Sequence, residues 1–282
     1  MKVGIHVSIA GSIDRAVDNA VSLGCTAFQI FSRNPRGWAA KPFSKNDISN
    51  FKQKASSSNI DGHSITVMMP FLPNLSSPDD DPHKRSVESL ILEIKRSSQL
   101  GIPYLVTRLG GHKGAGEKLG IERSVNALTK AAHDTPDDVM ILLQNSFGYQ
   151  NSVGSSLEQL GEIFSQLRPA NRFGFCLDTA HAFTSGYDFR TGNKVQDFMQ
   201  KFDGTLGLEN LKMIHLNDSK TELGSGVDRH EHIGMGKIGE DGLSFVLKMA
   251  KSKEIPVILE TPIDDRRDDL GNLKKARELA VQ

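Results

Sequence analysis

The chain of 282 residues lacks most of the features that mark secreted, membrane-bound or tail-bearing proteins. It has only two cysteines, Cys25 and Cys176, both among apolar residues, which indicates buried reduced thiols. Lys and Arg balance Asp and Glu at 34 each, so composition predicts neither a basic tail nor a membrane-binding surface. No apolar run reaches the length of a membrane span, and the first residues lack a secretory pattern. We therefore expect a cytoplasmic protein with no membrane partner.

Strand-like and helix-like segments alternate along the whole sequence. Eight short apolar runs predict strands at residues 3–7, 27–31, 65–69, 104–109, 139–143, 173–177, 211–216 and 256–259. Apolar residues at helical spacing separate them, as at residues 87–94. Continuous apolar strands alternating with helices are typical of a parallel sheet, and eight such units predict an α/β fold, a single (β/α)8 TIM barrel over residues 1–282. Residues 73–82, rich in Pro and Asp, are expected to form a loop.

In barrels of this kind the chemistry lies at the carboxyl ends of the strands. The residues at those predicted ends, or on the loops after them, are His6, Met68, Arg108, Gln144, Asp178, His181, His215, Asp228, His230 and Glu260. Histidine and carboxylate side chains are zinc-type ligands. Three carboxylates at one pole would repel one another unless cations lie between them. The pattern predicts a site with several divalent ions, which suits phosphoester hydrolysis; the simpler alternative is that each residue is a separate capping or surface group.

Basic and apolar side chains on neighbouring loops indicate a nucleic-acid ligand. They are Arg33, Arg36, Trp38 and Lys41 after the second predicted strand, Phe71 and Leu72 after the third, and His112, Lys113 and Lys118 after the fourth. Such loops can hold a phosphate backbone and insert a wedge between base steps. The alternative is that Trp38 and Phe71 simply pack on the rim of the barrel.

Eight blocks of sequence carry a family resemblance over nearly the whole chain. They are GIHVSIAG (4–11), FSRNPRGW (31–38), PFLPNL (70–75), NS (145–146), LDTAHAFTSGYDFRT (177–191), HLNDSK (215–220), GSGVDRH (224–230) and ILET (258–261). Together they resemble the endonuclease IV family of apurinic/apyrimidinic endonucleases. The resemblance implies a (β/α)8 barrel with three zinc ions that cuts the phosphodiester 5′ to an abasic site in duplex DNA.

The resemblance also implies roles for individual residues. Asp178, His215 and Glu260 match ligands of the family's second zinc, and His181, Asp228 and His230 match those of its third. Arg36, Phe71 and Leu72 match positions that enter the DNA at the lesion, and Trp38 closes the block that contains Arg36.

The chain departs from the family at the ligands of the first zinc. Where the family has two histidines and a bridging glutamate, this sequence has Met68, Arg108 and Gln144. Methionine is a soft neutral ligand, glutamine lacks the bridging charge, and arginine cannot bind a metal ion. We therefore expect the first zinc to be absent and the guanidinium of Arg108 to lie near its place, where it could bind a substrate phosphate.

The sequence thus predicts a metal-dependent phosphodiesterase, a monomer that acts on abasic-site DNA through zinc-activated water, with two zinc ions and reduced activity. The expected catalytic residues are Arg108, Gln144 and Glu260. One alternative is a catalytically impaired protein that binds abasic sites without cutting. Another is a metal-dependent sugar isomerase or epimerase on the same barrel, although a small sugar would need no projecting wedge.

Overall fold

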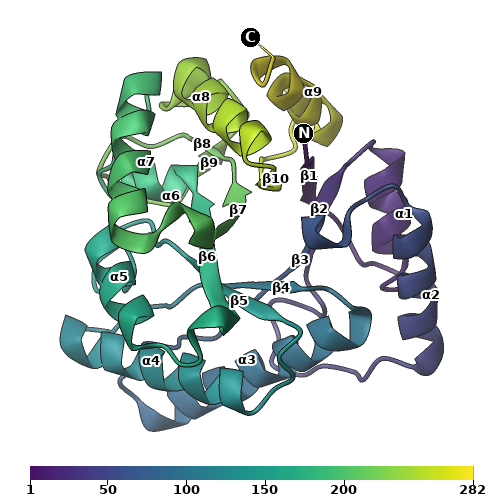
Figure 1. Cartoon of the computed structure of the whole chain (residues 1–282), viewed down its shortest axis with the longest axis vertical. Helices are drawn as coiled ribbons and strands as arrows, with labels where there is room; N and C mark the ends of the chain where they lie inside the picture. Colours follow the sequence, from purple (N-terminus) through teal and green to yellow (C-terminus); the bar gives the residue numbers. More distant parts are fainter. Residues whose placement is uncertain (282) are drawn as a thin grey trace.

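Eight parallel strands form a closed barrel in the computed structural model, which describes residues 1–281 (Figure 1). The strands are β1 (Val3–His6), β2 (Ala27–Ile30), β3 (Ile65–Met68), β4 (Tyr104–Thr107), β5 (Met140–Gln144), β6 (Phe173–Asp178), β7 (Leu211–His215) and β10 (Val257–Leu259). Each strand pairs with its neighbours along the chain, and β1 closes the ring by pairing with both β2 and β10. The predicted fold class is confirmed.

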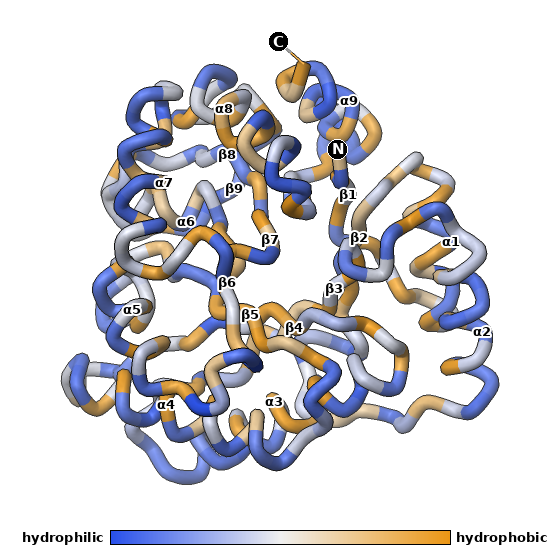
Figure 2. The backbone as a smooth tube through the Cα atoms, in the orientation of Figure 1, coloured by the Kyte–Doolittle hydropathy of each residue, from blue (hydrophilic) through white to orange (hydrophobic). Residues whose placement is uncertain are grey.

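Helices surround the ring of strands (Figure 1). They are α1 (Arg15–Ser22), α2 (Lys45–Ser57), α3 (Asp80–Leu100), α4 (Glu117–His133), α5 (Leu157–Gln166), α6 (Thr179–Thr184), α7 (Gly192–Leu206), α8 (Gly239–Ser252) and α9 (Asp269–Leu279). Single 3-10 turns, η1 (Gly62–Ser64), η2 (Ala170–Arg172) and η3 (Leu208–Asn210), lead into β3, β6 and β7. Figure 2 shows hydrophobic stretches along the strands and hydrophilic ones on the outer turns of the helices.

The predicted loop at residues 73–82 is too long at its carboxyl end. Helix α3 already begins at Asp80, and its first turns carry mostly charged residues. In residues 1–281 no helix combines the length and the apolar character that a membrane crossing requires. Both cysteines are free and buried, as expected.

The barrel interior explains why polar groups gather at one end. A small apolar layer fills the barrel, made of Ala27, Met68, Val106, Leu142, Cys176, Met213 and Ile258. Successive side chains of a strand alternate between its two faces, so residues two positions apart point the same way. The next inward residues after this layer are therefore Arg108, Gln144, Asp178, His215 and Glu260. Their inward direction follows from strand periodicity.

The chain between β7 and α8 forms a small hairpin that the apolar pattern does not reveal. Its strands, β8 (Asp218–Ser219) and β9 (His230–Glu231), have two residues each and pair antiparallel, with Ser219 opposite His230. The hairpin closes the segment that carries Asp228 and turns it toward the end of β6. Asp228 of the seventh loop thereby comes within 3.2 Å of Nε2 of His181.

Candidate metal centre

Asp178 connects β6 to the short helix α6. Its Oδ1 accepts a hydrogen bond of 2.9 Å from the backbone N–H of His181, and so it caps the helix. This cap fixes the first turn of α6 against the end of β6, and the ring of His181 lies with Nε2 3.9 Å from the Asp178 carboxylate. Both are fully buried.

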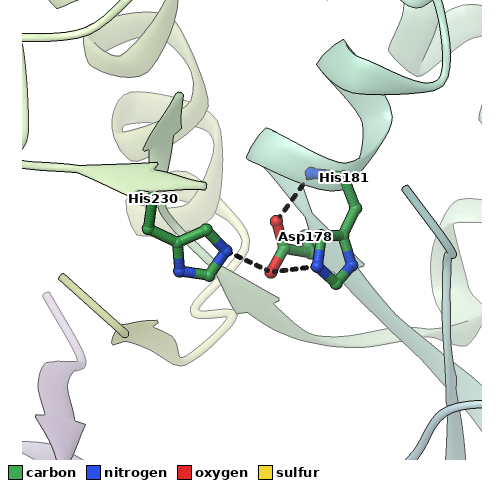
Figure 3. Close-up of side chains that lie close together, drawn as sticks. All are labelled: Asp178, His181 and His230. Carbon is green, nitrogen blue, oxygen red and sulfur yellow. Dashed lines mark hydrogen bonds and ion pairs between the residues drawn. The ribbon is translucent and has the colours of Figure 1, made fainter. Parts of the chain in front are cut away.

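Two histidines and two carboxylates meet beside this cap, and we call them the His181 cluster: Asp178, His181, Asp228 and His230. The Nε2 atoms of His181 and His230 lie 3.2 and 3.1 Å from the two carboxylate oxygens of Asp228. Each also lies 3.9 Å from Oδ2 of Asp178, which Figure 3 shows between the two rings. Tetrahedral ligands about 2.0 Å from a zinc ion lie roughly 3.3 Å apart, so the spacing suits a single ion.

The hydrogen bonds of the two rings engage Nδ1 and leave Nε2 facing the carboxylates. His181 donates from Nδ1 to the carbonyl oxygen of Asn145, and His230 donates from Nδ1 to that of Glu260, both at 2.9 Å. Within residues 1–281 neither Nε2 atom makes a well-directed hydrogen bond, although each lies close to an oxygen of Asp228. Metal-binding histidines commonly donate their second ring N–H to a carbonyl in this way. The donor set therefore fits zinc.

The charges of the cluster also favour a bound cation. Burial alone would lower the pKa of His230, but Asp228 and Asp178 outweigh it and raise that pKa to about 9. Burial would raise the pKa of Asp228, yet His181 and His230 hold it far below its usual range. The negative charge of Asp178 and Asp228 is thus stabilised by a nearby positive charge, which a proton on a histidine or a bound divalent cation can supply.

A second group shares Asp178 and lies next to the first. We call Asp178, His215 and Glu260 the His215 cluster; one ligand atom from each lies within 4.8 Å of the others. Nδ1 of His215 is 3.3 Å from a carboxylate oxygen of Glu260. Asn217 bridges the two acids, because its amide donates to Asp178 at 3.0 Å and accepts from the backbone N–H of Glu260 at 2.9 Å. All six predicted ligand residues are therefore brought together.

A buried carboxylate that we did not single out from the sequence anchors the seventh loop. Asp218 accepts backbone hydrogen bonds from Gly234, Gly236 and Ile238 at 2.9–3.1 Å and is fully buried. The N–H groups converge on one carboxylate as they do around a bound anion. The only sequence signal was an Asp within HLNDSK, followed by a segment rich in glycine.

The three residues at the altered positions take different places. Met68 is buried in the apolar layer below the clusters. Gln144 is buried, and its Oε1 accepts a hydrogen bond of 3.1 Å from Nε of Arg108. The guanidinium of Arg108 also approaches Asp228 at 3.8 Å, while 36% of its side chain stays exposed. A fixed positive charge therefore stands beside the His181 cluster.

A cavity of about 260 Å³ leads from the surface to this charge. Its floor includes Arg108, Gln144 and His181, and its rim includes Phe71 and Leu72. These two rim side chains are 54% and 42% exposed. A larger cavity of about 650 Å³ lies at the opposite end of the barrel and contains none of the predicted ligands.

The loop after β2 supplies two exposed cations, Arg36 and Lys41, and two packed side chains. Arg36 is exposed, but Trp38 is half-buried with the guanidinium of Arg85 4.5 Å above its ring. Arg33, which we expected among the basic residues facing the ligand, is buried and bonds Glu93 at 2.6 Å. That expectation was wrong, because the partner lies 60 residues away and a buried ion pair leaves no periodic signal.

The chain matches one family model over residues 17–280, that of the xylose isomerase-like TIM barrel. It is 57% identical over 280 residues to a probable endonuclease 4 of Nitrosopumilus maritimus, which covers 99% of this chain and 100% of that protein. A probable endonuclease 4 of Cenarchaeum symbiosum is 55% identical over the same shares of both chains. Among solved structures, endonuclease IV from Thermus thermophilus matches with a TM-score of 0.87 and 31% identity, over 99% of this chain and 98% of the other.

Proposed function

The chain belongs to the endonuclease IV family, and from this premise we propose that it hydrolyses the phosphodiester 5′ to abasic sites in duplex DNA. Membership of this family makes the chain an enzyme, an endonuclease of the hydrolase class. The observation that carries the proposal is a pair of adjacent ligand clusters, one of which reaches through His181 a cavity whose rim holds two exposed apolar side chains. We also propose that the chain acts as a monomer and that residues 1–282 form one domain.

The two clusters would hold two zinc ions. The four side chains of the His181 cluster would bind one, through the Nε2 atoms of the two histidines and the two carboxylates. Asp178, His215 and Glu260 would bind the other. When bound, zinc lowers the pKa of water toward neutrality and offsets the charge of a phosphate.

Arg108 would bind the scissile phosphate. Its side chain faces the cavity and is held from behind by Gln144, so its position is fixed before substrate arrives. A guanidinium offers paired donors to phosphate oxygens and would stabilise the negative charge that grows during hydrolysis. It does not acidify water, however, so we propose a rate lower than that of a three-zinc site, on the order of a thousandfold.

The rim would recognise the lesion. Phe71 and Leu72 project into solvent and would enter the duplex where a base is missing, since an abasic gap costs little unstacking. Arg36 is exposed and would contact the phosphate backbone. Trp38 already packs against Arg85, so its proposed share in binding is to support this surface from below.

The test is a single-turnover nicking assay on a duplex with one abasic analogue. We expect zinc-dependent cleavage on the 5′ side of the lesion, and none by an Asp178→Ala variant purified in parallel, which controls for contaminating nucleases. Tight binding without cleavage would instead favour a damage-binding protein, in which Arg108 and Gln144 occupy the site without restoring catalysis. Turnover of free sugars with no affinity for DNA would favour an isomerase.

A further inference from the structure

The two clusters differ in whether residues outside the cluster already form hydrogen bonds to their histidine ring nitrogens. In the His181 cluster the Nε2 atoms of His181 and His230 face the carboxylate of Asp228, another member of the cluster, at 3.2 and 3.1 Å. In the His215 cluster, by contrast, Nε2 of His215 lies 2.9 Å from Oε1 of Gln29, and Nδ1 lies 2.8 Å from the amide nitrogen of Gln144. Both ring nitrogens of His215 are therefore engaged.

Arg108 fixes which end of the Gln144 amide faces His215. Nε of Arg108 can only donate, so the amide group 3.1 Å from it must be the oxygen. The opposite amide orientation would place two donors against each other. Gln144 therefore presents N–H to Nδ1 of His215 and lies 3.5 Å from Asp178.

The direction of the remaining bonds agrees with this assignment. Gln144 donates to Nδ1 of His215, Nε2 of His215 donates to Gln29, and the Gln29 amide donates to Glu260 at 2.8 Å. The chain from Arg108 to Glu260 then has every donor facing an acceptor.

We propose that Gln144, held in place by Arg108, competes with zinc for Nδ1 of His215, so that the two clusters bind zinc with unequal affinity. The His181 cluster is the tight site and the His215 cluster the weak one. This inference rests on the proposed function, in which both clusters bind zinc. It makes Arg108 and Gln144 positioning residues that set metal affinity as well as residues that replace a lost ion.

The expected difference in zinc affinity between the two clusters follows from the hydrogen bonds that zinc binding must break. Zinc at the His215 cluster has to displace the Gln144 N–H, and turning that amide also breaks its charge-assisted bond from Arg108. Losing such bonds weakens binding by about tenfold to a hundredfold. At the His181 cluster the Nε2 atoms face the carboxylate oxygens of Asp228, which is itself a proposed ligand, so zinc binding there need not turn aside a side chain such as Gln144.

The experiment is a zinc titration of the metal-free protein against a competing chelator. The wild-type protein should show two steps separated by at least about tenfold. Gln144→Ala removes the competitor without adding a ligand, so the weaker step should tighten by about tenfold while the tighter step stays unchanged. Arg108→Met should also tighten the weaker step, since the freed amide can turn its oxygen inward. Gln150→Ala, at an exposed glutamine in the loop that follows β5, is the matched control and should change neither step.

Each alternative outcome has a separate meaning. A weaker second step in Gln144→Ala would show that Gln144 is a zinc ligand and would overturn the inference. Two steps of equal affinity in the wild-type protein would overturn it as well, yet leave the proposed function intact. Absence of any zinc step would contradict the proposed function itself. His181→Ala should remove the tighter step and keep the weaker one, and circular dichroism would confirm that this variant is folded.

Discussion

Asp178 belongs to both clusters, so Asp178→Asn should weaken both zinc sites at once. The substitution keeps the shape of the side chain and removes its charge. In the wild-type protein one oxygen accepts from the N–H of His181 at 2.9 Å and the other accepts from Asn217 at 3.0 Å. An asparagine has only one oxygen, so one of these donors loses its acceptor. The metal-free variant should therefore lose about 1 kcal/mol of stability.

Asp178→Asn should lose more stability when zinc is present in solution. With free zinc about a hundredfold above its dissociation constant, one bound ion stabilises the folded protein by about 2.7 kcal/mol. For a chain of this size, 1 kcal/mol shifts Tm by about 2 °C, so each ion should raise the wild-type Tm by about 5 °C. Loss of a shared charged ligand should weaken each site by at least about a hundredfold, and most of this shift should disappear.

Calorimetry with zinc and with EDTA separates the two effects. Asp188→Asn is the control, because Asp188 is a nearby acid that pairs with Arg190 at 2.8 Å outside both clusters. The control should keep the full zinc-dependent shift. An equally large shift in Asp178→Asn would refute the assignment of Asp178 as a shared ligand.

Three further predictions concern the altered positions, the rim and the charge of the site. The combined change Met68→His, Arg108→His and Gln144→Glu should add one zinc per chain and raise nicking, on the order of a thousandfold; unchanged zinc content would count against our interpretation of these positions. Phe71→Ala should weaken binding to an abasic duplex by about tenfold or more without altering zinc content, as gel-shift assays can measure; unaltered affinity would exclude it as a wedge. In the metal-free protein, His230 has a folded pKa of about 9 against an ordinary value of 6.5, so its stabilising contribution is complete below pH 6.5 and is lost as pH rises through 9. Urea unfolding in EDTA should show a decrease of up to about 3 kcal/mol over this window, and a flat profile would contradict the predicted charge state.

The sequence predicted the barrel well because its strands are continuous apolar runs. Once β6 and β7 were placed, their last residues, Asp178 and His215, had to lie at the same pole. The six predicted ligands do lie together, although their role in binding zinc stays a prediction.

Other features depend on contacts between distant residues and leave no local pattern. The hairpin that delivers His230 has strands of two residues, and it is held by the bonds of Asp218 to the following loop. Helix α3 begins earlier than expected because charged residues at its start hide the helical period. The bond between Arg108 and Gln144 joins two strands, and the sequence showed both residues without showing that they touch.

The most direct test of the central claim is the zinc content of the protein at saturation. Metal-free protein would be equilibrated with excess zinc, and the ratio of zinc to chain measured by mass spectrometry of the dissolved metal. We predict two zinc ions per chain, one for each cluster. A ratio of three would contradict the replacement of the first ion by Arg108, and a ratio of one or none would contradict the assignment of the two clusters.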